Sequence, residues 1–352
     1  MERRIGQRAT LARLACTLVM VLTAAGVVTA ATSTGGAGAA TGVPAHPSPG
    51  CLHGLDATDQ QGTPFSADGD NGAYTEEAPV TAVAARPRPL VVDLHAYQEP
   101  GQLQVALSGL GPYGKTEGFI TVTPWIVNRP VPLWQSLAGS RDLAWIGDFL
   151  THVEATSCVD ENRVFVTGYS NGAFMASLIA CHYSSRVAAV APVAGIQADS
   201  PCRSKRPVPV VAFHGTADPL VHYNGTPSKT AEGLPSPDGT GTITKQEAKV
   251  FGTKGIFAKG PSIPEEAAAW ARRNGCSTTV VTTRIAPDVS LLAWGCPPRA
   301  DVELYRIRGG GHTWPGSYDS AALSSLLGRT TFSISADAAM WRFFRAHPLK
   351  PG

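Results

Sequence analysis

The chain has 352 residues, of which 43% are hydrophobic, 16% charged and 7% aromatic. A chain this apolar can bury a sizeable core, whereas a mean hydropathy near zero and a single long apolar run exclude a polytopic membrane protein. The formal charge is +2, but without its first thirty residues the chain carries 25 basic against 26 acidic residues. This balance provides no basic surface for nucleic acid or an anionic membrane, so we expect a neutral partner or substrate.

The first thirty residues have the pattern of a secretory signal peptide. Arginines up to Arg13 precede an apolar run that begins at Leu14, and small residues at Val28 and Ala30 suit cleavage after Ala30. We therefore predict a signal peptide over 1–30, a secreted, extracellular protein, and no membrane contact after cleavage. An uncleaved anchor helix is the alternative, because the run is about long enough to span a bilayer.

Residues 31–50 are rich in Gly, Ala, Ser, Thr and Pro, and they predict a flexible leader. Residues 51–352 then fit one large catalytic domain, which we expect to be a monomer. Within this domain, short β-branched runs predict strands at 88–95, 118–124, 163–168, 187–194, 208–215 and 302–308. Most of these strands are apolar on both faces, which is typical of a mainly parallel sheet with helices on both faces.

Helical patterns alternate with these strands, at 141–155, 171–182, 265–274 and 336–346. In the last of them Met340, Phe343 and Phe344 should face the core. Trp145 and Trp341 lie on apolar helix faces, and we expect them to be packing residues rather than substrate contacts. The segment 223–262 interrupts the alternation of strands and helices. It is long, rich in Gly, Pro, Ser and Thr, and has no periodic pattern of apolar residues. We predict that it is a flap-like insertion near the mouth of the site.

Beyond the signal segment the chain has an even set of cysteines, which in an exported protein predicts disulfides: Cys51, Cys158, Cys181, Cys202, Cys276 and Cys296. Short loops favour Cys181 with Cys202 and Cys276 with Cys296, which leaves Cys51 for Cys158. Some of them remaining as free buried thiols is the alternative. The chain has no C-x-x-C pair, which argues against a zinc ribbon or a thioredoxin-type centre.

The sharpest motif is a G-x-S-x-G centred on Ser170, directly after one predicted strand and directly before a predicted helix. A strand-to-helix turn brings the serine to a crowded apex, where Gly168 and Gly172 avoid side chains that would collide. The helix start also points its amides at this region. Ser170 is therefore a candidate nucleophile, with an ordinary turn serine as the alternative.

A serine nucleophile needs a base and an orienting acid. Asp218 follows the strand at 208–215 immediately, and His312 follows the strand at 302–308 after three glycines that allow the loop to fold back. In this arrangement His312 takes the serine proton, while Asp218 holds the imidazole tautomer. An Asx-turn residue before Pro219 and an ordinary loop histidine are the alternatives for these two positions.

The oxyanion formed during acyl transfer requires backbone donors. We predict the N–H of Asn171, the residue after Ser170, and that of Tyr97, in the loop after the first strand of the domain. Three other histidines near strand ends, His95, His214 and His222, are predicted to be structural. Because no zinc-protease, P-loop or dinucleotide motif is present, we expect no metal and no cofactor.

These motifs in order, LVVDLHAY, CVDENRVFVTGYSNGAFMASLIAC, VAAVAPVAG, VAFHGTADPLVHY and GGGHTWPG, resemble the polyhydroxybutyrate depolymerase family of secreted esterases. That family is similar to feruloyl and acetylxylan esterases, and the resemblance implies the α/β-hydrolase fold and the triad Ser170, Asp218 and His312. One departure is Ala96, where the family usually has glycine after the histidine. If that position requires a positive φ, alanine would be strained by about 1–2 kcal/mol and the second oxyanion donor would shift.

Aromatic residues near the motifs are candidates for substrate contacts: Trp314, Trp134, Tyr169 and Tyr223. The sequence thus predicts a serine ester hydrolase that acts through an acyl-enzyme on 3-hydroxybutyrate-type polyesters or oligoesters. Feruloyl or acetylxylan esterase activity on plant cell-wall esters is the first alternative, and an acyltransferase is a further one. A non-catalytic binding protein on the same fold, with Ala96 marking a decayed site, is the alternative of another class.

Overall fold

The computed structural model describes residues 42–54, 57–79, 86–198, 201–244, 247 and 258–350. The predicted signal peptide over 1–30 lies outside the described residues. Within the described part of the chain, no helix combines the length and the apolar character needed to cross a bilayer.

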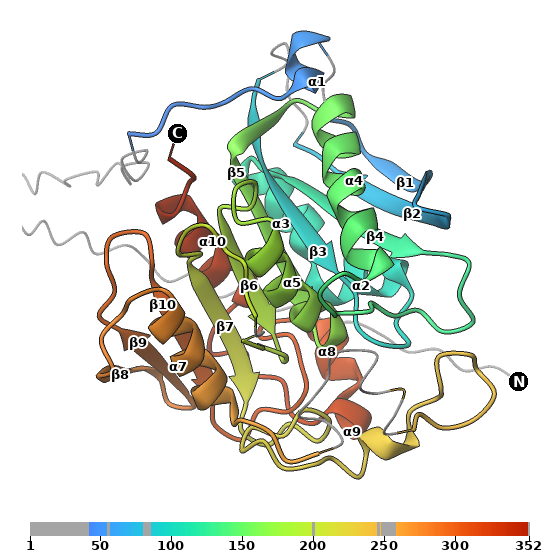
Figure 1. Cartoon of the computed structure of the whole chain (residues 1–352). Helices are drawn as coiled ribbons and strands as arrows, with labels where there is room; N and C mark the ends of the chain where they lie inside the picture. The colour runs from blue at the N-terminus through green and yellow to red at the C-terminus, as the bar shows by residue number, and fades with distance from the viewer. Residues whose placement is uncertain are drawn as a thin grey trace, which may run out of the picture. The chain divides into compact units, whose positions relative to one another are not determined.

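A single sheet of ten strands runs through this part of the chain, in the order β1-β2-β4-β3-β5-β6-β7-β10-β9-β8 (Figure 1). The strands are β1 Gln60–Ala67, β2 Asp70–Glu77, β3 Arg88–Leu94, β4 Ile120–Ile126, β5 Val159–Tyr169, β6 Ala189–Val193, β7 Val210–Gly215, β8 Val280–Ala286, β9 Val289–Trp294 and β10 Val302–Ile307. The strands from β4 to β10 in this order are parallel to one another, and antiparallel strands flank them at both edges. The prediction of a mainly parallel sheet is confirmed.

Helices cover both faces of the sheet (Figure 1). They are α1 Pro49–Leu52, α2 Gly101–Ser108, α3 Leu110–Glu117, α4 Arg141–Thr156, α5 Asn171–His182, the 3₁₀ turn η1 Ala231–Gly233, α7 Ile263–Arg273, α8 Tyr318–Ala322, α9 Ser324–Leu327 and α10 Ala336–Ala346. Residues of α4, α5 and α7 belong to one apolar cluster, and residues of α2, α3 and α10 belong to the cluster on the other face.

The central strands have continuous apolar sequences because their successive side chains pack alternately into these two clusters. In β3, Leu90 and Val92 pack into the cluster of α4 and α5, whereas Val91 between them packs into the cluster of α10. These positions are at most 1% exposed, so both faces of the strand require apolar residues there. The inward side chains predicted for α10 are confirmed, since Met340, Phe343 and Phe344 are all buried.

The edges of the sheet carry the strands that the sequence analysis did not identify. β1 and β8 present mostly exposed positions, and β1 has a register shift between Gln60 and Thr63. Polar, half-exposed strands lack the continuous apolar run that marks a central strand. β8 and β9 still carry a readable signal, because two β-branched runs flank Pro287 and Asp288 at the turn of a hairpin.

The end of the predicted leader differs from the expectation of a flexible segment over 31–50. Within it, Pro47 forms an isolated bridge with Asp160, and the Ser48 N–H donates to the carbonyl of Val159 over 2.9 Å. The Ser48 hydroxyl also donates to Ser157, and Val43 is only 9% exposed. Backbone pairing with the start of β5 therefore holds residues 43–50, although their composition offers little apolar surface.

All three predicted disulfides are confirmed: Cys51–Cys158, Cys181–Cys202 and Cys276–Cys296. The first joins α1 to the residue that precedes β5, across 107 residues. The second joins the end of α5 to a loop before β7, and the third joins the loop after α7 to the end of β9. Each bridge closes a loop and thereby reduces the entropy of the unfolded chain.

Candidate active site

Ser170 occupies the turn between β5 and α5, in a backbone conformation that L-residues avoid. Its φ is 53° and its ψ is −112°, outside the helical and extended regions. Added Cβ atoms at the flanking glycines would clash: at Gly172 the nearest atom is the Leu94 carbonyl oxygen at 2.2 Å, and at Gly168 it is the backbone of Gly172 at 2.5 Å. The two glycines of the motif are thus required for this turn to sit against β3.

Asp218 and His312 meet beside this turn. Asp218 lies in the loop after β7, and its Oδ2 atom is 2.7 Å from Nδ1 of His312. Its other oxygen accepts hydrogen bonds from the backbone N–H groups of Leu220 and Val221, both at 2.8 Å. Because Nδ1 faces a carboxylate, it carries the imidazole proton, and Nε2 keeps its lone pair.

The electrostatics keep Asp218 ionised inside the protein. Burial by itself raises the pKa of this carboxyl, but the neighbouring His312 and His214 and the Val221 N–H together lower it below its usual value. His214 has its Nε2 atom 2.9 Å from the Val221 carbonyl oxygen and 3.3 Å from Asp218 Oδ2. Burial lowers the pKa of His214, which favours the neutral form of its imidazole.

The glycines before His312 allow its loop to pack against the end of β7. An added Cβ at Gly215 would lie 2.2 Å from the Gly310 carbonyl oxygen, and one at Gly311 would lie 2.1 Å from that of Leu327. The His312 N–H donates to the same Leu327 carbonyl over 2.6 Å, and its own carbonyl accepts a hydrogen bond from the Tyr169 hydroxyl. Backbone contacts on both sides therefore fix where the imidazole lies.

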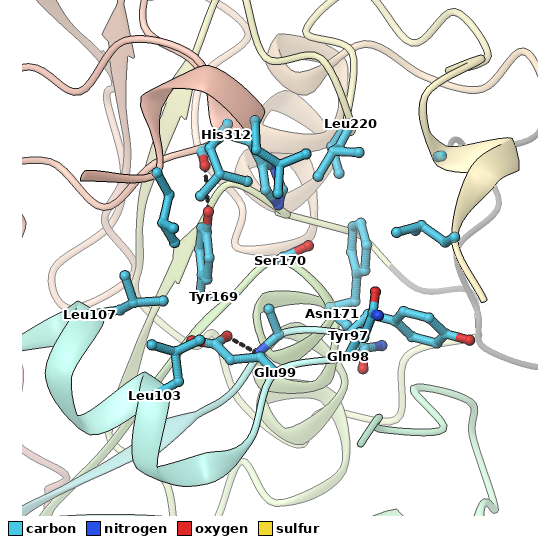
Figure 2. A pocket seen from close by; sticks show the side chains of 18 of the residues that line it. Tyr97, Gln98, Glu99, Leu103, Leu107, Tyr169, Ser170, Asn171, Leu220 and His312 are labelled. Atoms are coloured by element: carbon cyan, nitrogen blue, oxygen red, sulfur yellow. Dashed lines mark hydrogen bonds between the residues drawn. The ribbon is translucent and has the colours of Figure 1, made fainter. Parts of the chain in front are cut away.

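Ser170, Asn171 and His312 line one cavity of about 390 Å³ (Figure 2). Apart from them its walls are mainly apolar: Ala96, Tyr97, Gln98, Glu99, Leu103, Leu107, Tyr169, Phe174, Leu220, Val221, Ala231, Leu234, Ile243, Leu323, Leu326 and Leu327. Figure 2 shows Ser170 in the middle of this space, with His312 above it and Leu103 and Leu107 to one side. The volume and the apolar lining are those of a small-molecule site.

Several of these wall residues escaped the sequence analysis. Leu103 and Leu107 lie one helical turn apart on α2, and Leu323 and Leu327 are spaced in the same way around α9. This i, i+4 spacing was a readable signal for an apolar face, but not for which cavity that face lines. Leu234 and Ile243 come from the described part of the segment predicted as a flap, which thus reaches the site.

Asn171 lies at the first position of α5, where its backbone N–H has no intrahelical acceptor. Its side chain is fully used elsewhere: Oδ1 accepts from the Trp134 N–H at 2.7 Å, and Nδ2 donates to the Trp134 carbonyl at 2.9 Å. The Asn171 side chain thus holds the loop before α4, and Asn171 also lines the cavity together with Ser170.

The loop after β3 is shaped by Glu99. Its Oε2 atom accepts the Ala96 N–H at 2.7 Å, and the Glu99 N–H returns to the Ala96 carbonyl at 3.4 Å. The residue of this loop with a positive φ is Gln98, at 62°, and Ala96 is not among the described residues with a positive φ. The condition under which alanine would be strained, a positive φ at position 96, is therefore not met.

Glu99 is also the buried acid of the cavity wall. It is 5% exposed, and burial raises the pKa of its carboxyl to about 8, with a further upward contribution from Asp93 on β3. The neighbouring Asp93 is fully buried, accepts from Gln104 Nε2 at 2.6 Å, and has a pKa raised to about 7 by burial. Glu99 is thus a neutral acid at pH 7 in the wall of the cavity that Ser170 also lines, a feature that no sequence motif indicated.

Three of the four predicted substrate aromatics do not reach this cavity. Trp314 is 1% exposed, and its indole N–H donates to Asp337 at 2.8 Å, away from the site. Trp134 is fully buried and packs on the His95 ring at 4.8 Å. Tyr223 lines a different cavity beyond His214, so these three predictions are wrong. Tyr169 does line the site, but its hydroxyl is bonded to the His312 carbonyl.

Tyr97, predicted as a backbone donor, lines the cavity, and its hydroxyl donates to the Pro235 carbonyl at 2.7 Å. His95 has its Nδ1 atom 2.8 Å from the Ala96 carbonyl, and His222 has its Nδ1 atom 3.0 Å from the Thr226 hydroxyl. Such contacts fit structural histidines. Among residues 42–350, as far as they are described, no cluster of three or more His, Cys, Asp or Glu side chains is arranged to hold a metal ion.

A model of the dienelactone hydrolase family matches residues 132–234, the stretch that contains Ser170 and Asp218. Together with the parallel sheet and the serine at the turn after β5, this match decides the fold. The chain has the α/β-hydrolase fold.

Curated proteins that this chain is similar to include esterases. The chain is 28% identical over 176 residues to feruloyl esterase B of Piromyces equi. The matched stretch covers 49% of this chain and 28% of the relative. The chain is also 25% identical over 135 residues to a bifunctional acetylxylan esterase/xylanase of Neocallimastix patriciarum, covering 38% of this chain and 20% of the relative. The chain thus matches less than a third of the length of these two relatives.

Among solved structures, this chain is similar to an acetyl xylan esterase from Aspergillus awamori. The TM-score is 0.49 at 17% identity, over 75% of this chain and 98% of that one.

Proposed function

We propose that this chain is a serine-dependent carboxylic-ester hydrolase that acts through an acyl-enzyme on Ser170. The observation that carries the proposal is the contact between His312 Nδ1 and Asp218 Oδ2, at 2.7 Å, beside a strained serine in an apolar cavity. An imidazole oriented in this way has its other nitrogen available as a base, which is what a serine needs in order to attack an ester.

In the proposed reaction the Ser170 hydroxyl attacks the ester carbonyl carbon while His312 Nε2 accepts the hydroxyl proton. The tetrahedral intermediate collapses, the C–O bond to the alcohol breaks, and His312 returns the proton to the departing alcohol. Water then repeats the sequence on the acyl-enzyme and releases the acid. Asp218 stays ionised throughout and stabilises the imidazolium that forms twice in each turnover.

The proposed oxyanion donors are the backbone N–H of Asn171 and, as the second donor, that of Tyr97. The position of Asn171 at the start of α5 supports the first assignment. The second is favoured over Ala96, because the Ala96 N–H is already bonded to Glu99. Loss of one such donor typically slows acyl transfer by about 10²–10³-fold.

The proposed substrates are feruloyl or acetyl esters of plant cell-wall polysaccharides. Two observations support them: the names of the curated relatives, a feruloyl esterase and an acetylxylan esterase/xylanase, and the apolar walls of the cavity. The 3-hydroxybutyrate oligoesters favoured by the sequence analysis are therefore the second choice. The three disulfides support an oxidising, extracellular location, where such esters occur.

Labelling with a fluorophosphonate probe tests the serine mechanism, because the probe reacts only with an activated serine. We expect the wild-type protein to be labelled and Ser170→Ala to remain unlabelled. Absence of labelling in the folded wild-type protein would instead favour the non-catalytic binding protein.

A panel of methyl ferulate, acetylated xylan and oligomeric 3-hydroxybutyrate tests the substrate class. We expect the highest kcat/KM on one of the first two. A clear preference for the 3-hydroxybutyrate oligomers would overturn the substrate assignment and leave the serine mechanism intact.

A further inference from the structure

A second cavity, of about 500 Å³, lies at the edge formed by β8, β9 and β10, away from Ser170. Three arginines line it, Arg284 on β8, Arg306 on β10 and Arg308 just beyond β10. Tyr223, Ser290 and Asp288 also contribute to its walls. Nothing in the proposed esterase reaction uses this cavity.

The register of the strands brings two of these arginines onto one face. Arg284 pairs with Ser290 of β9, and Ser290 pairs with Arg306 of β10. Residues in register on neighbouring strands point to the same face, so the two arginines flank Ser290 across two strand spacings, about 10 Å. Farther back along β10 the same face is apolar and packed, since Leu304 is fully buried. On this face of β10 the buried Leu304 is thus followed by Arg306, at the point where the strand reaches the cavity.

The positive charge of this cavity is not neutralised within the described chain. Among the ion pairs of the described residues, none involves Arg284, Arg306 or Arg308. The acid in the wall, Asp288, is paired with a fourth arginine, Arg329, at 2.9 Å, and also accepts from the Thr331 hydroxyl at 2.8 Å. Three guanidinium groups thus share one cavity with a single carboxylate, which is already paired with Arg329, and among the described residues Arg284 and Arg308 bond only to the backbone carbonyls of Ala286 and Pro287. The cavity therefore keeps an excess of positive charge.

The hydroxyls of the cavity complement the arginines as hydrogen-bond donors. The Tyr223 hydroxyl oxygen is buried and has no hydrogen-bond partner among the described residues. Its pKa is raised by burial and lowered by the charge of Arg306, which places that guanidinium near it. The Ser290 side chain lies between two arginines. A buried hydroxyl without a partner is costly unless a ligand or water supplies one.

We propose that this cavity binds an oxyanion of the carboxylate, sulfate or phosphate type, held by Arg306 and Arg284 and by the Tyr223 hydroxyl. Guanidinium groups recognise such anions through paired N–H donors, and a tyrosine hydroxyl adds one more. An anion neutralises the three arginines and gives the Tyr223 hydroxyl an acceptor. Uronic acid saccharides, inorganic ions and phosphorylated or sulfated molecules all supply this chemistry.

The test is a binding measurement on the whole protein with sodium D-glucuronate, sodium sulfate and sodium phosphate at constant ionic strength. D-glucose serves as the neutral comparator for glucuronate. We expect saturable binding of at least one oxyanion, seen as a concentration-dependent rise in Tm, and none of D-glucose. Preference for glucuronate would indicate a saccharide carboxylate, and preference for the inorganic ions would indicate a phosphate or sulfate ligand.

Arg306→Gln and Arg284→Gln remove one guanidinium each from the cavity, and we expect each to weaken binding by about tenfold or more. Arg272→Gln on α7 is the matched control, since it removes the same charge from an exposed arginine outside this cavity. Arg284 is exposed on an edge strand, so its variant should fold even if that of the half-buried Arg306 does not. The proposal is overturned if no oxyanion binds saturably, or if binding survives unchanged in Arg284→Gln.

Discussion

Asp218 Oδ2 lies 2.7 Å from His312 Nδ1, although 94 residues separate the two in the chain. The same carboxylate accepts two backbone N–H groups through Oδ1, so both of its oxygens have a fixed orientation. This contact places the imidazole proton on Nδ1 of His312. Nε2 then has a free lone pair, which the proposed role of His312 as a base requires.

Asp218→Asn should therefore reduce kcat by about 10³–10⁴-fold without unfolding the protein. The amide oxygen can keep accepting from Leu220 and Val221, which turns the NH₂ group toward His312. His312 Nδ1 then becomes an acceptor, its proton moves to Nε2, and that nitrogen can no longer take the Ser170 proton. Steady-state hydrolysis of p-nitrophenyl acetate measures the effect, with circular dichroism as the folding control. Near wild-type turnover in this variant would contradict the assigned role.

Gly172→Ala should destabilise the protein and abolish most activity, because the added Cβ would lie 2.2 Å from the Leu94 carbonyl oxygen and 2.6 Å from that of His95. Neither backbone group can move without shifting β3 and the loop after it. Gly233→Ala is the matched control, since nothing lies within 4 Å of a Cβ there. Thermal unfolding and esterase rates of the two variants are compared, and equal behaviour would contradict the packing argument.

Glu99→Gln should flatten the alkaline limb of the pH–rate profile. In the wild type, the pKa of about 8 means that Glu99 is neutral at pH 7 and gains a negative charge above pH 8. That charge would lie in the wall where the oxyanion forms, so kcat/KM should fall as the pH rises through 8. The groups that also act there are Asp93 on β3, with a pKa of about 7, and Tyr169 on β5, whose pKa is far above the range tested.

The glutamine can still accept the Ala96 N–H, so the loop should keep its conformation at pH 7. Rates from pH 6 to 10 are measured for wild type, Glu99→Gln and the exposed control Glu232→Gln. A control profile that matches the wild type, together with a flattened profile for Glu99→Gln, supports the role. A decline above pH 8 that persists unchanged in Glu99→Gln would show that another group causes it.

Glu76→Gln should stabilise the protein at alkaline pH. Glu76 on β2 is fully buried, its Oε1 accepts from the Ser157 hydroxyl at 2.7 Å, and burial raises the pKa of its carboxyl to about 7. An acid whose folded pKa is above its unfolded value contributes stability that is complete below about pH 4.5 and is lost as the pH rises through 7.

Glutamine removes this titration, so the Tm of the variant should exceed that of the wild type at pH 8.5 and lose the advantage at pH 4.5. Thermal unfolding at the two pH values measures the difference. A Tm difference between variant and wild type that is the same at both values would mean that Glu76 does not titrate in this range.

The sequence by itself determined those features that depend on local pattern and chain order. Apolar runs identified the central strands, and the positions of Ser170, Asp218 and His312 after successive strands predicted that these residues meet at one edge. Short loop length selected two disulfide pairs and left Cys51 with Cys158 as the third. In each case the information lies within a few residues, or in the rule that parallel strands end at the same edge of a sheet.

Only the tertiary structure decided which side chains line the cavity. Trp314 is two residues from His312, yet its indole is drawn to Asp337 on α10, while leucines from α2 and α9 form the wall instead. Glu99 became part of the site because its carboxylate bonds to Ala96 and is buried there. Side-chain direction depends on contacts between elements far apart in the chain, and no local pattern encodes them.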